Sequence, residues 1–77
     1  MRTLCDIPPG QSATIARVIG EDSLSMRLME MGLTDGESVA VVGRAPMGDP
    51  IEISLRGYRL SLRLVEASRV EVESPSS

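Results

Sequence analysis

Histidine, tryptophan, phenylalanine and lysine are absent from this 77-residue sequence, and cysteine and tyrosine occur once each, as Cys5 and Tyr58. Without histidine and with a single cysteine, one chain cannot assemble the usual zinc, haem or iron–sulfur site. Serine–histidine and cysteine–histidine nucleophile systems are excluded because the base is missing. A disulfide framework is excluded because one cysteine has no partner in the chain. These absences predict a protein that is not an enzyme and has neither a metal site nor a cofactor.

The charge balance also narrows the class of protein. Eleven acidic residues stand against eight arginines, giving a formal net charge of -3 and a pI near 4.8. A nucleic-acid binder of the stacking type needs aromatic side chains on a basic surface, so we expect no nucleic-acid partner. No apolar run approaches the length of a membrane span, and the first ten residues lack the apolar core of a signal peptide. The sequence therefore predicts a cytoplasmic protein.

The length allows one small domain. We expect this domain to cover residues 1–73 and the Ser-Pro-Ser-Ser segment at 74–77 to be a disordered tail.

The segment Asp22–Met31 is predicted to be the helix of this fold. Asp22 or Ser23 can cap its first turn by accepting from free backbone amides. Gly32 suits the left-handed position after the last turn, which would bring Leu33 back against the helix in a Schellman motif. One face is apolar at the i, i+4, i+7 spacing of a buried stripe, formed by Leu24, Leu28 and Met31.

Three further segments have the composition of strands. Ser12–Gly20 is rich in β-branched residues, and Ser38–Gly43 is apolar on both faces, as in a central strand. Arg69–Glu73 alternates apolar and charged residues. Residues 1–10 end in Ile-Pro-Pro-Gly and are expected to lead into the first strand, and Arg44–Pro50 is a proline-stiffened loop.

The clearest pattern is a hairpin between residues 51 and 64. Apolar and polar residues alternate along Ile51–Arg56 and again along Arg59–Leu64. The pair Gly57-Tyr58 between them suits a two-residue type II′ turn. That turn would place each apolar residue opposite another, Glu52 opposite Arg63, and Arg56 opposite Arg59.

The order of elements is strand, helix, strand, hairpin and strand. Short amphipathic strands bury their apolar faces most economically by closing on themselves. We therefore expect a mostly β protein: a small five-stranded barrel with one α-helix after the first strand.

Four stretches of the sequence resemble the FeoA family of ferrous-iron transport accessory proteins. They are LCDIPPG at 4–10, RLMEMGLTDG at 27–36, APMGDPI at 45–51 and GYRLSLR at 57–63. The resemblance implies an SH3-like barrel, a cytoplasmic location and a role beside FeoB, a membrane permease with a cytoplasmic G domain. A barrel with one tyrosine cannot line the aromatic groove that reads proline-rich peptides, so SH3-like describes the shape rather than the ligand.

Because the chain has few side chains that hold iron, we expect it to act by contact with another protein. The candidate partner-binding residues are Met26, Met29, Met47, Arg56, Tyr58 and Arg59. The methionines would supply a flexible apolar surface, and the hairpin tip a small cationic spot beside an aromatic anchor. Each has a simpler interpretation as a scattered surface residue or part of a shaped loop. Structural roles are expected for Leu24, Leu28, Met31, Gly32 and Gly57, and Cys5 is expected to be a half-buried small hydrophobe.

The function predicted from the sequence is therefore an accessory or regulatory protein of ferrous-iron uptake that contacts the FeoB-type permease, with any membrane contact made only through the permease. One alternative is a metal-responsive module that binds a transition metal weakly, because the domain also resembles the C-terminal module of iron-dependent repressors. Their DNA reader would have to precede this domain, and the sequence starts at Met1 with a lead-in strand, so we expect none. Another alternative is a structural adaptor that forms weak homo-oligomers through strand edges.

Overall fold

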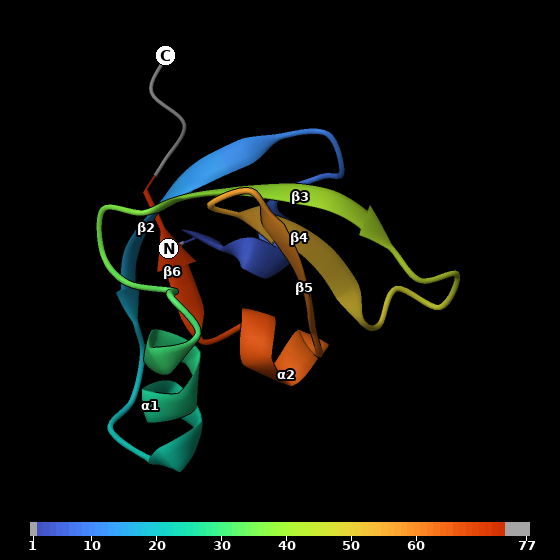
Figure 1. The fold of residues 1–77 in the computed structure, drawn as a ribbon. Helices are drawn as coiled ribbons and strands as arrows, with labels where there is room; N and C mark the ends of the chain where they lie inside the picture. Colours follow the sequence, from blue (N-terminus) through green and yellow to red (C-terminus); the bar gives the residue numbers. More distant parts are fainter. Residues whose placement is uncertain (1, 74–77) are drawn as a thin grey trace.

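The computed structural model describes residues 2–73, which form one antiparallel sheet of six strands together with short helices (Figure 1). In chain order the elements are β1 (Arg2–Thr3), the 3-10 turn η1 (Leu4–Asp6), β2 (Ser12–Val18), α1 (Ser23–Glu30), β3 (Ser38–Arg44), β4 (Ile51–Leu55), β5 (Tyr58–Leu62), α2 (Leu64–Ala67) and β6 (Val70–Val72). The expected tail at 74–77 lies outside the described residues. No helix within residues 2–73 is long and apolar enough to cross a membrane.

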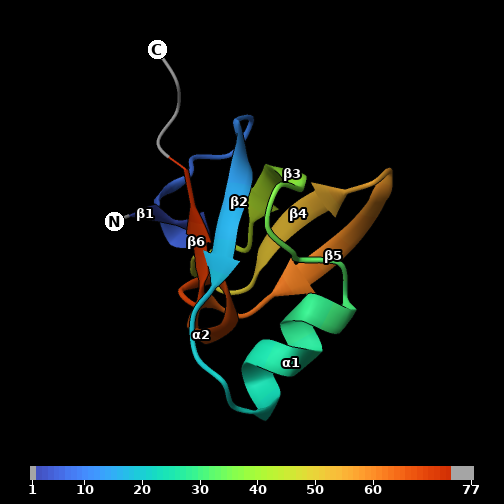
Figure 2. The ribbon, with the colours of Figure 1, turned by 90° about the vertical axis from the view of Figure 1, so that its left-hand side faces the viewer.

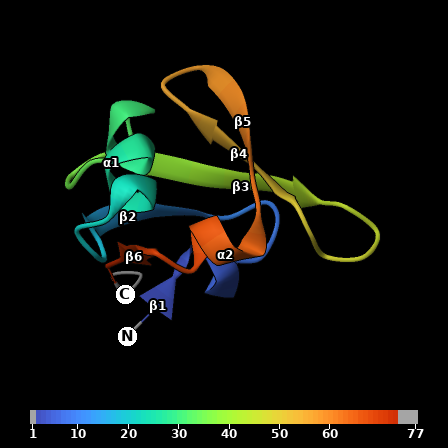
Figure 3. The same ribbon diagram turned by 90° about the horizontal axis from the view of Figure 1, so that it is seen from below.

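The strands follow the spatial order β1-β6-β2-β3-β4-β5, and the sheet curls strongly (Figure 2). Seen from below, α1 and the β3–β4 loop lie at opposite ends of the molecule, with α2 between them (Figure 3). The inner face of the sheet, η1 and both helices supply one apolar core. Its members are Leu4, Ile7, Ile15, Leu28, Leu33, Val39, Val41, Ile51, Ile53, Leu55, Leu62, Ala67, Val70 and Val72.

The mostly β architecture with a helix ahead of the central strands is confirmed. The barrel has one strand more than expected, because Arg2 and Thr3 pair with the last strand opposite Val72 and Glu71. A two-residue strand has no periodicity of its own. Its pairing depends on β6, almost seventy residues away, so only the tertiary structure reveals it.

Helix α1 is capped at both ends by local interactions. The Asp22 carboxylate accepts a hydrogen bond from the Ser25 backbone N–H at 3.3 Å. At the other end Gly32 lies in the left-handed region, with φ +102°. The Leu33 N–H donates to the Leu28 carbonyl at 3.2 Å, which is the bond that defines a Schellman motif. Leu28 is fully buried, whereas Leu24 and Met31 pack half-buried against the core.

The predicted hairpin is present, but its predicted turn and register are wrong. The turn residues are Arg56 and Gly57, both with positive φ, as in a type I′ turn. Leu55 consequently pairs with Tyr58, and Ile53 with Leu60. The observed register differs from the predicted one by two residues. Because side chains alternate with a period of two, this shift keeps every apolar residue on the core face, so the pattern could not distinguish the two registers.

The shift also removes two predicted cross-strand pairs. Glu52 lies opposite Ser61 rather than Arg63, and Arg59 lies opposite Ser54 rather than Arg56. The two arginines of the hairpin tip are therefore not direct neighbours across the strands.

The predicted end of the second hairpin strand is wrong as well, because Leu64 begins helix α2. The Glu66 carboxylate accepts from the Arg63 N–H at 2.8 Å, and the Asp49 carboxylate accepts from the Leu64 N–H at 3.0 Å. Two amides at the start of the helix are thus satisfied by acidic side chains. Alternation of Leu60, Leu62 and Leu64 suggested a continuing strand, since the position of Asp49 could not be read from the sequence.

Candidate partner-binding surface

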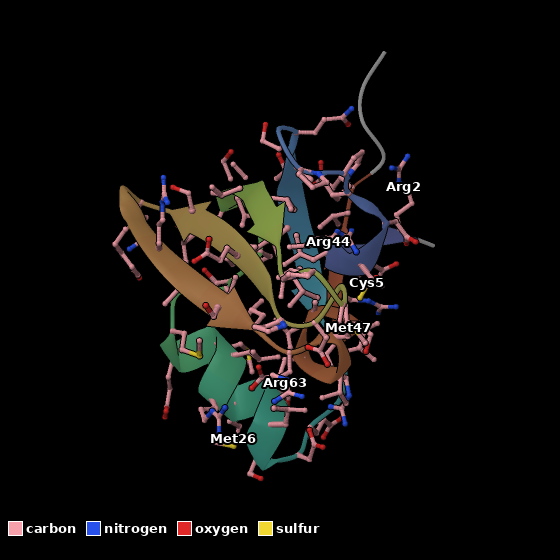
Figure 4. All side chains as sticks on the ribbon, turned by 90° about the vertical axis from the view of Figure 1, so that its right-hand side faces the viewer. Arg2, Cys5, Met26, Arg44, Met47 and Arg63 are labelled. Carbon is pink, nitrogen blue, oxygen red and sulfur yellow. The ribbon has the colours of Figure 1, made fainter. Side chains whose placement is uncertain are left out.

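The outer face of α1 carries two exposed methionines. Met26 is 56% and Met29 42% exposed, whereas Leu28 between them is completely buried. At 100° per residue, a helix that turns Leu28 inward carries Met26 and Met29 away from the core. Met26 lies midway along α1, on the side of the helix away from the sheet (Figure 4).

Tyr58 connects the hairpin tip to the C-terminal end of α1. Its hydroxyl donates a hydrogen bond to the Met31 carbonyl at 3.1 Å. Gly32 lies so close that a Cβ there would be 3.4 Å from the tyrosine oxygen and 3.1 Å from Leu55 Cδ2. The helix end and the hairpin tip are therefore in contact at Tyr58. We use the name α1–hairpin surface for the candidate residues on these two elements, namely Met26, Met29, Arg56, Tyr58 and Arg59.

The two arginines of this surface differ in their partners. The Arg56 guanidinium binds both carboxylate oxygens of Glu37, with Nε 3.0 Å from Oε1. That hydrogen-bonded ion pair lowers the pKa of Glu37 and raises the pKa of Arg56. Arg59 makes no ion pair with any residue between 2 and 73 and is exposed. Arg59 is therefore the arginine of this surface whose charge is available to a partner.

Met47 lies elsewhere, on the loop between β3 and β4, and is 91% exposed. The loop is held at both ends. Arg44 donates to the backbone carbonyls of Cys5 and Ile7, at 2.8 and 3.1 Å. Asp49 accepts from Arg63 at 3.1 Å. The structure thus presents Met47 on a preorganised loop but does not bring it together with the methionines of α1, which lie at the other end of the molecule (Figures 1 and 3).

Removal of the Tyr58 hydroxyl tests the connection between α1 and the hairpin. We expect Tyr58→Phe to lower the free energy of unfolding by about 0.5–1.5 kcal/mol, because the Met31 carbonyl loses its side-chain donor while the ring stays in place. Urea unfolding followed by circular dichroism measures this change. Arg59→Gln, which removes a charge without a partner among the described residues, is the control and should change stability by less than about 0.5 kcal/mol. Equal stability of Tyr58→Phe and the native protein would contradict a stabilising tether.

Three carboxylates have a lowered pKa because arginines bind them, namely Asp22 by Arg69, Glu37 by Arg56 and Asp49 by Arg63. A lowered pKa in the folded state stabilises the fold above the unfolded pKa, which is about 4 for these groups, and the stabilisation is lost as the pH falls through the folded pKa. We therefore expect the free energy of unfolding to decrease steadily from about pH 4 downward. Urea titrations at pH 7, 5 and 3 measure the decrease.

The variant Asp49→Asn is the matched control for that titration. It should be less stable at neutral pH and lose less stability between pH 5 and pH 3, because one of the three linked carboxylates is gone. Stability that rises on acidification in the native protein would contradict the assignment.

Sequence reasoning missed two features of this region. Val65 is 63% exposed on α2, and its strand-like context concealed that it lies on a helix. An ion pair between Arg27 and Glu66, with Nη2 2.7 Å from Oε2, joins α1 to α2 across 39 residues of sequence. Neither the exposure of Val65 nor the ion pair has a signal in the neighbouring sequence.

Within residues 2–73, no three His, Cys, Asp or Glu side chains are grouped so that they could hold a metal ion. Cys5 is half-buried, and its thiol lies 3.6 Å from the Leu64 carbonyl.

Comparison with known proteins places these features in a family. Residues 2–74 match the model of the FeoA domain. A fusion of Fe(2+) transport protein A with the Fe(2+) transporter FeoB from Porphyromonas gingivalis is 38% identical over 74 residues, which cover 96% of this chain and 9% of that protein. The chain thus spans about a tenth of the length of this curated relative.

Solved structures agree with the family and the fold. The FeoA protein of Stenotrophomonas maltophilia, crystallised with zinc and described as an SH3 domain protein, is 34% identical, with a TM-score of 0.84 over 95% of this chain and 91% of that one. A manganese-dependent transcriptional repressor superposes with a TM-score of 0.85 over 96% of this chain and 36% of that one. Its 21% identity supports the shared fold alone. The SH3-like fold and the family match together show that this chain belongs to the FeoA family of ferrous-iron transport.

Proposed function

We propose that this protein is a non-enzymatic accessory protein of ferrous-iron uptake, which docks in the cytoplasm on a FeoB-type permease and its G domain and biases their activity. The observation that carries this proposal is the relative in which the same domain is covalently joined to a FeoB transporter. Fusion gives two domains a high effective concentration for each other. Where such domains are not fused, a contact surface has to replace the linker.

The α1–hairpin surface has the chemistry for such a contact. Met26 and Met29 offer adaptable apolar side chains, and Tyr58 offers a half-exposed ring whose hydroxyl is already bonded within the fold. Aromatic, methionine and arginine side chains are enriched in protein interfaces. The hydrogen bond from Tyr58 holds the helix and the hairpin in one arrangement, which lowers the entropy lost on binding.

The test is a calorimetric titration of this protein with the cytoplasmic region of a FeoB-type permease. We expect Met29→Asp to weaken binding at least about tenfold, because a charge would be buried in the contact, and Arg59→Glu to weaken it similarly by reversing the charge that meets the partner. Val65→Asp is the matched control, since it places the same charge on the exposed face of the other helix. Binding that is unchanged in Met29→Asp and Arg59→Glu would contradict this surface.

Met47 is proposed as a second contact, because its loop is held by hydrogen bonds at both ends. The distance between the loop and α1 means that one partner reaches both only by wrapping around the domain. Met47→Asp in the same titration decides the matter: weakened binding supports the second contact, and native affinity removes Met47 from the interface.

A further inference from the structure

Strand β5 forms an open edge of the sheet. It is the last strand in the spatial order, and its only strand neighbour within residues 2–73 is β4. Figures 2 and 4 both show β5 at the outer margin, with no strand beyond it. The opposite edge is β1, which is only two residues long. A five-residue open edge is a template for pairing with another chain, and most folds cover or interrupt such edges.

The register of the hairpin shows which backbone groups of β5 point outward. The turn at residues 56 and 57 makes Leu55 and Tyr58 a hydrogen-bonded pair. Hydrogen-bonded and non-bonded pairs alternate along antiparallel strands, so Arg59 and Ser61 direct their N–H and C=O groups away from β4. No backbone or side-chain group in the described part of the chain bonds to them, and both residues are exposed.

The edge is also the cationic part of an acidic protein. Residues 56–63 contain three arginines and no acid, whereas the rest of the chain has five arginines against eleven acids. Arg56 is paired with Glu37, and Arg63 with Asp49, so Arg59 in the middle carries the charge without a partner among residues 2–73. The nearest acid on the neighbouring strand, Glu52, lies opposite Ser61 and forms no ion pair with Arg59.

We propose that the open edge of β5 binds an extended acidic segment of a partner protein, which adds to the sheet as a further strand. The outward groups of Arg59 and Ser61 supply the backbone hydrogen bonds, and the Arg59 guanidinium binds a carboxylate of the added strand. This proposal rests on the docking role proposed above and names the chemistry of the segment that docks.

Charge argues against a second copy of the chain as the added strand. Pairing β5 with another β5 would bring the three arginines of residues 56–63 close to three more, with no acid in either segment. Like charges facing each other across strands are destabilising. An acidic strand reverses the sign of that interaction and supplies a partner for Arg59.

The first test uses peptides, so that it does not depend on the permease. Blocked eight-residue peptides that alternate threonine with glutamate, or threonine with lysine, are titrated into ¹⁵N-labelled protein at low salt. We expect saturable shifts centred on the amides of residues 58–62 with the glutamate peptide, slower hydrogen exchange at Arg59 and Ser61, and neither effect with the lysine peptide. A glutamate peptide interrupted by proline should bind at least about tenfold more weakly, because it cannot complete the ladder.

Variants of Ser61 and Arg59 test separately the backbone hydrogen bonds and the charge contact of the proposal. Ser61→Pro removes an N–H that the fold does not use and should abolish the exchange protection, whereas Ser61→Thr keeps the N–H and should bind normally. Arg59→Gln should weaken the glutamate peptide about tenfold and leave the fold intact, which keeps the test decisive if the proline variant does not fold.

The outcomes separate this proposal from the docking role. If the glutamate peptide shifts residues elsewhere, or binds Arg59→Gln as well as the native protein, strand addition at β5 is wrong. If Arg59→Gln instead makes the protein self-associate in sedimentation, the charge of Arg59 serves only to prevent β5 from pairing with another copy, and the proposal is overturned. If the peptide binds as expected while the permease region does not bind, the edge is supported and the docking role fails.

Discussion

The variant Leu28→Ala is expected to lose about 2–5 kcal/mol of folding stability. Leu28 is completely buried, and it is the apolar side chain through which α1 enters the core of the fold. Removing Cγ and both Cδ atoms leaves a cavity that the surrounding strands fill only in part. A domain of this length has a total stability of roughly 4–12 kcal/mol, so this loss is a large fraction of the whole.

Leu24→Ala is the matched control, because Leu24 lies one turn earlier on the same stripe but is only half-buried. We expect it to cost about half as much or less, since its side chain already keeps part of its surface in water. Thermal unfolding followed by circular dichroism compares the two, and each kcal/mol corresponds to roughly 4–8 °C in Tm at this size. Equal losses in the two variants would show that α1 is not anchored through Leu28.

The second large effect is expected for Gly32→Ala. Gly32 has φ +102°, where residues with a Cβ are strained, and that Cβ would lie 3.1 Å from Leu55 Cδ2. The backbone strain costs about 1–2 kcal/mol, and crowding of the core by one methyl group costs about 1–3 kcal/mol more. The same Cβ would lie 3.4 Å from the Tyr58 hydroxyl oxygen, an ordinary van der Waals distance, so the crowding is at Leu55.

The variant Gly36→Ala separates the cost of backbone strain at positive φ from the cost of crowding by the added Cβ. Gly36 also has positive φ, at +86°, but a Cβ there would meet no atom within 4 Å. We expect Gly36→Ala to show the backbone strain alone, so the difference between the two variants in urea unfolding measures the crowding at Gly32. If both variants lost the same stability, the close approach of helix, hairpin and Leu55 would contribute nothing.

These stability variants bear on function because Gly32 and Tyr58 hold α1 against the hairpin. A weaker contact there should lower affinity for a docking partner even without a change in any exposed side chain, because the α1–hairpin surface is no longer preorganised. Tyr58→Phe is the mildest such change, since it keeps the ring. Its binding measured beside its unfolding free energy would show whether the surface depends on the tether.

Much of this fold could be predicted from local pattern. The limits of α1 agree with the structure to within one residue at each end, because Asp22 and Gly32 satisfy its free backbone groups through neighbours in the sequence. Alternation of apolar and polar residues placed the strands and the core face of the hairpin. The lack of histidine and the scarcity of cysteine and aromatic side chains favoured action by protein contact. Four short motifs indicated the FeoA family, whose domain model matches residues 2–74.

The candidate site was less accessible to sequence reasoning. The sequence indicated Met26, Met29 and Tyr58 as separate candidates and did not show which of them are neighbours. The curl of the sheet decides this, because it brings the hairpin tip against α1 and leaves Met47 far from both. Partner contacts at all six candidate residues stay predictions until binding is measured.

The sequence by itself determined what depends on neighbours along the chain: the helix and its caps, the alternation of the strands, and the charge of residues 56–63. Only the tertiary structure decided what depends on distant contacts. A hairpin shifted by two residues keeps the same apolar face, so the pattern allowed both registers. In the structure, Arg56 takes a left-handed conformation while its guanidinium binds Glu37, which lies 19 residues away. That register leaves the backbone of Arg59 and Ser61 facing outward on the open edge of β5.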